Sequence, residues 1–147
     1  MHTILGSNGT VGPGLVEALR RRNFPVRGVN RRPHPGDWEY VVADVTKPAD
    51  VMAAVEGSEV VYLLVGIEYN LQVWQRNWPV IMDNAIKACV ENGAKLVFMD
   101  NVYAYGLVDG PMTEETPMRP SSEKGKVREK VDRMLLDAMD SGLKACI

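Results

Sequence analysis

One glycine-spaced stretch decides how this chain folds: Gly6-Ser7-Asn8-Gly9-Thr10-Val11-Gly12. It follows a short apolar run, His2–Leu5, and precedes residues 11–22, whose apolar side chains recur with the period of a helix. The predicted order is therefore strand, glycine turn, helix. Such a turn gathers unpaired backbone N–H groups at the positive end of the helix dipole. The stretch predicts a binding place for an anionic group where the helix begins.

The glycine spacing fits the pyrophosphate of a dinucleotide such as NAD(P), which must approach the backbone closely. We expect Gly6 to permit the sharp turn, Gly9 to let the backbone touch phosphate, and Gly12 to let the helix pack closely on the sheet. The residues between them complete the predicted cofactor site: Ser7, Asn8 and Thr10, which can add side-chain donors, and Val11. A glycine turn without a ligand is the alternative.

Short apolar runs alternate with helical patterns along the rest of the chain, which is typical of a parallel sheet. Further strands are predicted at 25–29, 40–43, 60–65, 95–99 and 143–147. Further helices are predicted at 47–56 with Thr46 as its cap, at 71–91 with a kink or restart at Pro79, and at 123–139. The connection 30–37 is too short for a full crossover helix. The predicted fold class is α/β: a three-layer Rossmann fold whose doubly wound parallel sheet has about six strands, with helices on both faces.

Composition indicates one domain, residues 1–147, that binds a small molecule. A chain of 147 residues with 46% hydrophobic composition can bury one core. Its net charge of −2, with acidic and basic residues interleaved, argues against nucleic acid or a charged membrane as partner. No signal peptide and no apolar stretch of about twenty residues is present, so we expect a cytoplasmic protein.

The remaining reactive and aromatic residue types have structural interpretations. Cys89 and Cys146 have no metal-ligand spacing and are expected to be reduced and buried, while His2 and His34 are expected to be structural or exposed. Trp74, Trp78 and the methionines are expected in the core or an interface. No metal site is predicted.

The end of the second strand predicts which nicotinamide cofactor is bound. An acidic residue there would hold the ribose 2′-hydroxyl of NAD, but the sequence has Asn30, Arg31 and Arg32. Guanidinium groups suit the 2′-phosphate of NADP, so NADP is expected rather than NAD, although both arginines can also be solvated loop charges. Asp44, after the third strand, can accept a hydrogen bond from the adenine amino group or help Thr46 to organise the next helix.

Several motifs together resemble the short-chain dehydrogenase/reductase superfamily, in its extended or atypical branch of NAD-dependent epimerases and dehydratases. The motifs that carry the resemblance are Gly6, Gly9 and Gly12, then Asp44-Val45, Leu64-Val65-Gly66, Asn84 and Val102-Tyr103-Ala104-Tyr105-Gly106. The resemblance covers the whole chain. It implies that Asp44 and Val45 contact adenine and that Leu64, Val65 and Gly66 line the cofactor, with Asn84 as the family's asparagine in the long helix.

The catalytic positions depart from that family's pattern. Where the family has a Ser near the end of strand five and Tyr-x-x-x-Lys on the next helix, this sequence has Asn101, Lys124 and Arg128. Asn101 can still donate to a substrate oxygen, Arg128 can hold the nicotinamide ribose, and Lys124 is a proton donor only if its pKa is lowered. Two solvated cations are the alternative for the lysine and arginine. Tyr103 and Tyr105 are candidate substitute acids, with packing as their expected role.

Two functions remain open. One is an epimerase-, dehydratase- or reductase-like oxidoreductase acting on a sugar nucleotide or another small carbonyl or alcohol substrate; the other is an NADP-binding sensor or structural module without turnover. Members of the resembled branch are longer and place the substrate pocket in a C-terminal half, so a truncated chain or completion by another copy is expected. The resemblance also implies a homodimer through the helices at 71–91 and 123–139.

Overall fold

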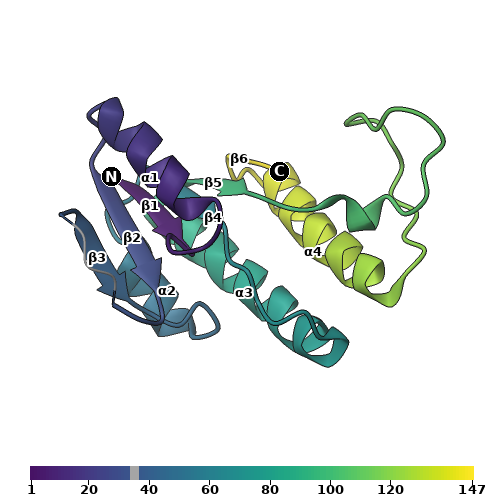
Figure 1. The fold of residues 1–147 in the computed structure, drawn as a ribbon, viewed down its shortest axis with the longest axis horizontal. Coiled ribbons are helices and arrows are strands. Elements are labelled where there is room, and N and C mark those ends of the chain that lie inside the picture. The colour runs from purple at the N-terminus through teal and green to yellow at the C-terminus, as the bar shows by residue number, and fades with distance from the viewer. Residues whose placement is uncertain (34–36) are drawn as a thin grey trace.

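Six short parallel strands form one sheet in the computed structural model, which describes residues 1–33 and 37–147 (Figure 1). The strands are β1 (His2–Leu5), β2 (Val26–Asn30), β3 (Glu39–Val42), β4 (Val60–Leu63), β5 (Lys95–Phe98) and β6 (Ala145–Cys146). Their order across the sheet is β3-β2-β1-β4-β5-β6, and every neighbouring pair is parallel. The predicted α/β class and doubly wound topology are confirmed.

Helices cover both faces of this sheet. The helices are α1 (Gly12–Arg21), α2 (Pro48–Val55), α3 (Leu71–Asn92) and α4 (Glu123–Asp140), with a 3-10 turn η1 (Val102–Ala104) after β5. Figure 1 shows α1 on one face of the strands, and a small apolar cluster joins α1 to β1 and β2. The larger core lies on the other face, between the sheet and α2, α3 and α4. The winding direction reverses between β1 and β4, which opens a crevice at the carboxyl ends of these strands.

Two details differ from the sequence-based expectations, and a third agrees with them. The helix α3 runs through Pro79 as one element and does not restart there. Lys47, not Thr46, is the N-cap residue of α2, and no side chain caps this helix. The described part of the β2–β3 connection contains no helix, as expected, and His34 lies outside the described residues.

The remaining structural expectations have mixed outcomes. Trp74 and Trp78 are buried in the larger core, as predicted. Cys89 is also buried, and burial raises the pKa of its thiol to about 12. Cys146 is exposed, however, because the short strand β6 forms the edge of the sheet. His2 is half-buried, and its Nδ1 lies 3.0 Å from the Tyr62 hydroxyl. None of the described helices combines the length and apolar character needed to cross a bilayer.

The start of α1 is pressed against the glycine turn that precedes it. A Cβ atom at Gly12 would lie 2.1 Å from the carbonyl oxygen of Ser7, well inside van der Waals contact. At Gly14, two residues on in the same helix, a Cβ would meet nothing within 4 Å. Close packing at Gly12 was predicted, but its partner is the turn backbone.

We expect Gly12→Ala to destabilise the protein and Gly14→Ala to stabilise it. The first substitution forces backbone apart and should lower the free energy of unfolding by about 1–3 kcal/mol. The second only replaces glycine inside a helix and should raise it by about 0.5–1 kcal/mol. Urea denaturation followed by circular dichroism measures both. Equal effects of the two substitutions would contradict the close approach at Gly12.

Candidate cofactor cleft and the residues at its end

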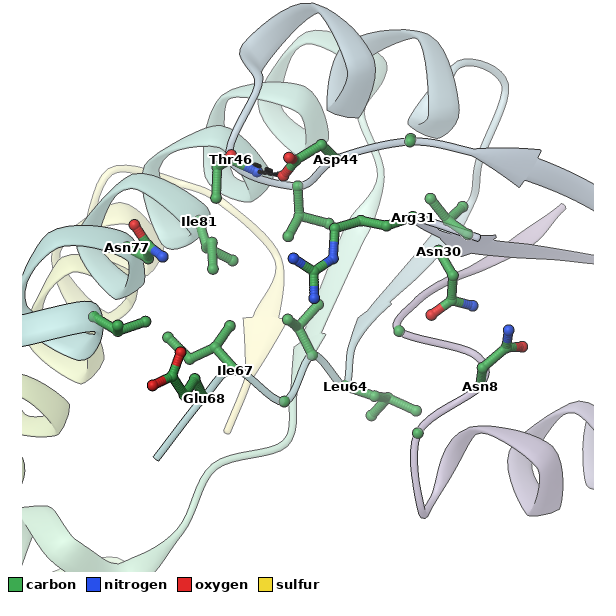
Figure 2. Close-up of a pocket in the computed structure, with 18 of the residues that line it drawn as sticks. Asn8, Asn30, Arg31, Asp44, Thr46, Leu64, Ile67, Glu68, Asn77 and Ile81 are labelled. Atoms are coloured by element: carbon green, nitrogen blue, oxygen red, sulfur yellow. Dashed lines mark hydrogen bonds between the residues drawn. The ribbon is translucent and has the colours of Figure 1, made fainter. Parts of the chain in front are cut away.

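A cavity of about 630 Å³ opens at the carboxyl ends of the strands, a size typical of ligand pockets (Figure 2). Its walls are the glycine turn, the segments that follow β2, β3 and β4, and one side of α3. Most residues predicted for the cofactor line this main cavity: Gly6, Asn8, Gly9, Thr10, Val11, Asn30, Arg31, Asp44, Val45, Leu64, Val65 and Gly66. The sequence therefore located the cavity, although the predicted contacts with a cofactor stay predictions.

The glycine turn presents backbone to the main cavity. Gly6 has a φ of +94°, a conformation that glycine adopts without strain, and its Cβ would approach the backbone of Leu64 and Val65 at 3.0 Å. Gly9 lies on the cavity wall. The turn thus fits a pyrophosphate at the start of α1, because the helix N-terminus and side-chain-free backbone face the same space.

Ser7 was predicted to add a side-chain donor to the cofactor site, but it does not line the main cavity. Its side chain is buried below the turn, and its Oγ accepts a 2.6 Å hydrogen bond from Asn30 Nδ2. This bond joins the turn after β1 to the end of β2, so Ser7 shapes the cleft without lining the main cavity. Neither Gly12 nor Asn84 lines it either: Asn84 is buried in α3 and donates a 3.0 Å hydrogen bond from Nδ2 to the Val45 carbonyl oxygen.

Arg31 extends into the main cavity between the segments that follow β2 and β4 (Figure 2). Arg32 does not line this space; it borders an adjacent hollow with Asn8, Asn30 and Arg31. The two arginines thus lie on neighbouring parts of one surface. This surface carries the cations predicted to face a 2′-phosphate.

Asp44 faces the same end of the cleft. Its Oδ1 accepts hydrogen bonds from the backbone N–H of Thr46 at 2.9 Å and from the Thr46 hydroxyl at 2.7 Å. These bonds, and to a smaller degree the charge of Arg31, hold the pKa of Asp44 below its ordinary value. Asp44 therefore holds Thr46 in the segment that leads into α2, which is one of its two predicted roles. It also lines the main cavity, and the other predicted role, a hydrogen bond from the adenine amino group, stays a prediction.

Part of the cavity wall was not predicted. The lining residues that the sequence analysis did not predict come mainly from the segment after β4 and from α3. They are Val29, Ala43, Thr46, Ile67, Glu68, Val73, Arg76, Asn77 and Ile81. The alternation of Val73, Arg76, Asn77 and Ile81 at helical spacing was a usable signal, since it places one side of α3 over the cleft. The described residues contain no group of His, Cys, Asp or Glu that could hold a metal ion.

The residues predicted for catalysis lie beyond β5. Asn101 is exposed, and its Oδ1 accepts a 3.0 Å hydrogen bond from the backbone N–H of Tyr103, which leaves its amide N–H groups for another partner. Lys124 is half-buried in the first turn of α4, with its Nζ 3.2 Å from the ring centroid of Tyr69. It is therefore held in a cation–π contact rather than extended into solvent.

Arg128 is not a solvated cation. Its side chain is 2% exposed, forms an ion pair with the buried Asp100 carboxylate and lies 4.0 Å from the ring centroid of Trp78. Asp132, one turn further along α4, is also buried. Burial lowers the pKa of Arg128 to about 10, with the charge of Asp132 acting against this change. The alternative that Arg128 is a solvated cation is thereby excluded. Its contact with a nicotinamide ribose stays a prediction.

Comparison with known proteins connects this arrangement to a family. Residues 2–147 match the model of the NAD dependent epimerase/dehydratase family. No curated protein sequence matches the chain. The chain is similar in structure to a short-chain dehydrogenase/reductase superfamily protein from Agrobacterium tumefaciens with bound NAD, at 25% identity and a TM-score of 0.87 over 99% of this chain and 47% of that one.

Two solved epimerases share the fold at lower identity. The UDP-glucose 4-epimerase of Thermus thermophilus, in complex with NAD, has 21% identity and a TM-score of 0.85, over 99% of this chain and 53% of that one. The UDP-Glc/GlcNAc 4-epimerase of Campylobacter jejuni has 19% identity and a TM-score of 0.86, over 99% and 51%. The chain therefore spans about half the length of the solved structures it matches.

The buried Asp132 predicts a pH dependence of stability. Desolvation, opposed by the charge of Arg128, raises the pKa of Asp132 from 3.8 to about 6. Between these two values the folded protein holds a proton that the unfolded chain has lost, so the free energy of unfolding falls as pH rises from about 4 to about 6. Replacing Asp132 by Asn removes this loss, and the variant should gain about 1–3 kcal/mol relative to wild type across that range.

Urea denaturation of Asp132→Asn at pH 4 and pH 7.5 tests this expectation. Asp137→Asn, on the exposed side of the same helix, is the matched control and should follow wild type at both pH values. A constant difference between Asp132→Asn and wild type across the range would contradict the raised pKa.

Proposed function

The chain belongs to the NAD-dependent epimerase/dehydratase family, and on that premise we propose that it is the NADP-binding part of an oxidoreductase acting on a sugar nucleotide or another small carbonyl or alcohol. The observation that carries the proposal is the main cavity, which joins a backbone turn suited to pyrophosphate to a guanidinium suited to phosphate. The Agrobacterium and Thermus structures hold NAD, and the Thermus and Campylobacter enzymes are named as epimerases of UDP-sugars.

The preference for NADP rests on the charges at the end of β2. Arg31 projects into the main cavity, and Arg32 and Asn30 border the hollow beside it. The position after β2 that would hold a ribose 2′-hydroxyl through a carboxylate has these three residues instead. Charge-assisted hydrogen bonds from a guanidinium to a phosphate are stronger than bonds between neutral groups.

For the reaction we propose that Asn101 and Lys124 face the substrate, with Arg128 at the same end of the cleft. Asn101 has free amide donors that can bind a substrate oxygen, and Lys124 supplies a positive charge near it. The cofactor supplies or accepts a hydride when bound. These residues bind and orient the substrate oxygen at which the proton is exchanged.

A binding module without turnover is the second candidate. It is favoured by one observation: Arg128, at the position of the family's catalytic lysine, is buried in an ion pair with Asp100. Such a module would bind NADPH without oxidising it. Oxidation of bound NADPH by any carbonyl compound would contradict this second candidate.

Calorimetric titration with NADPH and NADH tests the cofactor assignment. Wild type should bind NADPH more tightly than NADH, and Arg31→Asp should weaken NADPH binding about 10- to 100-fold while changing NADH binding much less. Arg22→Asp makes the same charge change at the far end of α1 and should leave both affinities unchanged. Equal affinity for the two nucleotides in wild type would contradict the preference for NADP, and no heat with either would contradict the cofactor site.

We also propose a homodimer through the outer sides of α3 and α4. These helices pack side by side and leave apolar side chains exposed, among them Val80 and Val90 on α3 and Leu136 on α4. Light scattering over a concentration series should therefore report a dimer whose dissociation constant rises at least about tenfold in Val80→Glu. Leu107→Glu, in the loop after η1, is the matched control. A monomer at every concentration would contradict the proposal.

A further inference from the structure

Two tyrosines and a lysine from three separate elements meet beside the main cavity. Tyr69 follows β4, Tyr103 lies in η1, and Lys124 lies in the first turn of α4. The Tyr69 and Tyr103 hydroxyl oxygens are 3.5 Å apart, and Lys124 Nζ lies 3.2 Å from the Tyr69 ring centroid. Trp74 of α3 stacks on Tyr103, with ring centroids 6.2 Å apart and planes at 21°. The three polar groups are therefore held as one cluster.

The cluster borders a pocket of its own, of about 330 Å³. This aromatic pocket is lined by Tyr69, Leu71, Tyr103, Ser122, Glu123 and Lys124. The segment after β4 separates it from the main cavity, since Ile67 and Glu68 line the main cavity and Tyr69 lines the aromatic pocket. Consecutive residues of the segment after β4 thus line the main cavity and the aromatic pocket.

The aromatic pocket lies toward the end of the cleft that the nicotinamide would reach. The glycine turn suits the pyrophosphate, and Arg31 and Asp44 mark the adenosine side, over β2 and β3. A dinucleotide that crosses the carboxyl ends of the strands must continue toward β4 and β5. Tyr69 and Tyr103 stand in the segments that follow these two strands.

The cluster also has a cation on a pocket wall, which Arg128 does not provide. Arg128 is 2% exposed and paired with Asp100, whereas Lys124 is half-buried on the wall of the aromatic pocket. Gly125 brings this lysine to Tyr103, because a Cβ there would lie 2.6 Å from the Tyr103 carbonyl oxygen. The start of α4 is therefore in direct contact with η1.

We infer that the Tyr103 hydroxyl is the group that exchanges a proton with the substrate oxygen, with Lys124 as its partner cation and Tyr69 as its hydrogen-bond partner. This inference rests on the proposed oxidoreductase function and assigns its proton-transfer residue to η1 rather than to α4. Tyr103 is then a catalytic residue, and Lys124 and Tyr69 are positioning residues.

In the direction of carbonyl reduction, a bound reduced nicotinamide would supply a hydride to the carbonyl carbon, and the electron pair of the C=O π bond would move to the oxygen. Tyr103 gives its hydroxyl proton to that oxygen, which completes the alcohol. The tyrosinate that remains is stabilised by the charge of Lys124 and regains its proton from solvent. In the oxidative direction each step is reversed.

The surroundings of Tyr103 suit a proton donor. The hydrogen bond with Tyr69 raises the pKa of Tyr103 above its ordinary value of 10.0, and the charge of Lys124 acts in the opposite direction. Tyr103 is therefore protonated at neutral pH, the form that reduction requires. The Lys124 charge stabilises the tyrosinate formed when the proton leaves.

The first test is a titration of tyrosinate absorbance in the protein without cofactor. The difference between wild type and Tyr103→Phe isolates the Tyr103 step. Lys124→Met should move this step to higher pH, and Tyr69→Phe should move it to lower pH. Lys130→Met should leave it unchanged, since Lys130 is exposed on the same helix and does not line the aromatic pocket. A Tyr103 step that does not respond to Lys124→Met would overturn the inference.

The second test is single-turnover oxidation of bound NADPH by 2,3-butanedione. Tyr103→Phe should slow this oxidation about 100-fold or more with unchanged NADPH affinity, whereas Tyr105→Phe should match wild type. An unchanged rate in Tyr103→Phe would overturn the inference and leave the oxidoreductase function standing. Failure of wild type to bind NADPH would instead contradict the proposed function, and the titration would still decide whether Tyr103 and Lys124 are paired.

Discussion

The cleft depends on one backbone contact, the approach of α1 to the Ser7 carbonyl. That contact requires position 12 to carry no side chain, since a Cβ would lie 2.1 Å from the oxygen. The same Ser7 accepts a hydrogen bond from Asn30, so the position of α1 is linked to the end of β2. Arg31 follows directly and enters the main cavity from there. The glycine at the start of α1 thus permits the packing that links this helix to the end of β2, from which Arg31 enters the main cavity.

At the other end of the cleft, a buried ion pair fixes α4. A buried arginine and a buried aspartate are costly to desolvate, and their pairing is tolerated because each charge compensates the other. The Arg128 guanidinium also lies over Trp78 and close to Phe98, with ring centroids at 4.0 and 5.1 Å. Since these partners come from α3, from β5 and from the segment that follows β5, the arginine joins α4 to three parts of the chain. It follows that Arg128 is part of the packing of this core.

The sequence predicted the alternation of strands and helices and most of the cavity wall because both depend on local patterns. A glycine turn between a strand and a helix has few alternative geometries, and the apolar runs determine which segments are strands. What could not be predicted depends on contacts between distant segments. Nothing near Ser7 indicates that its hydroxyl is bound by Asn30, and nothing near Arg128 indicates a partner at Asp100. An arginine on a charged helix is usually solvated, so its burial becomes visible only in the packed structure.

The same reasoning explains why Tyr103 and Lys124 meet although they are far apart in sequence. Gly106 allows the segment before α4 to fold back, since its φ is +70° and a Cβ there would lie 2.1 Å from the Arg119 carbonyl oxygen. Gly125 then allows α4 to begin against η1. Gly106 and Gly125 therefore allow Lys124 to lie next to Tyr103. Gly12 likewise allows α1 to pack against the glycine turn at the opposite end of the cleft. Backbone contacts at glycines thus determine the geometry of both ends of the cleft, and the charged and aromatic side chains determine what each end can bind.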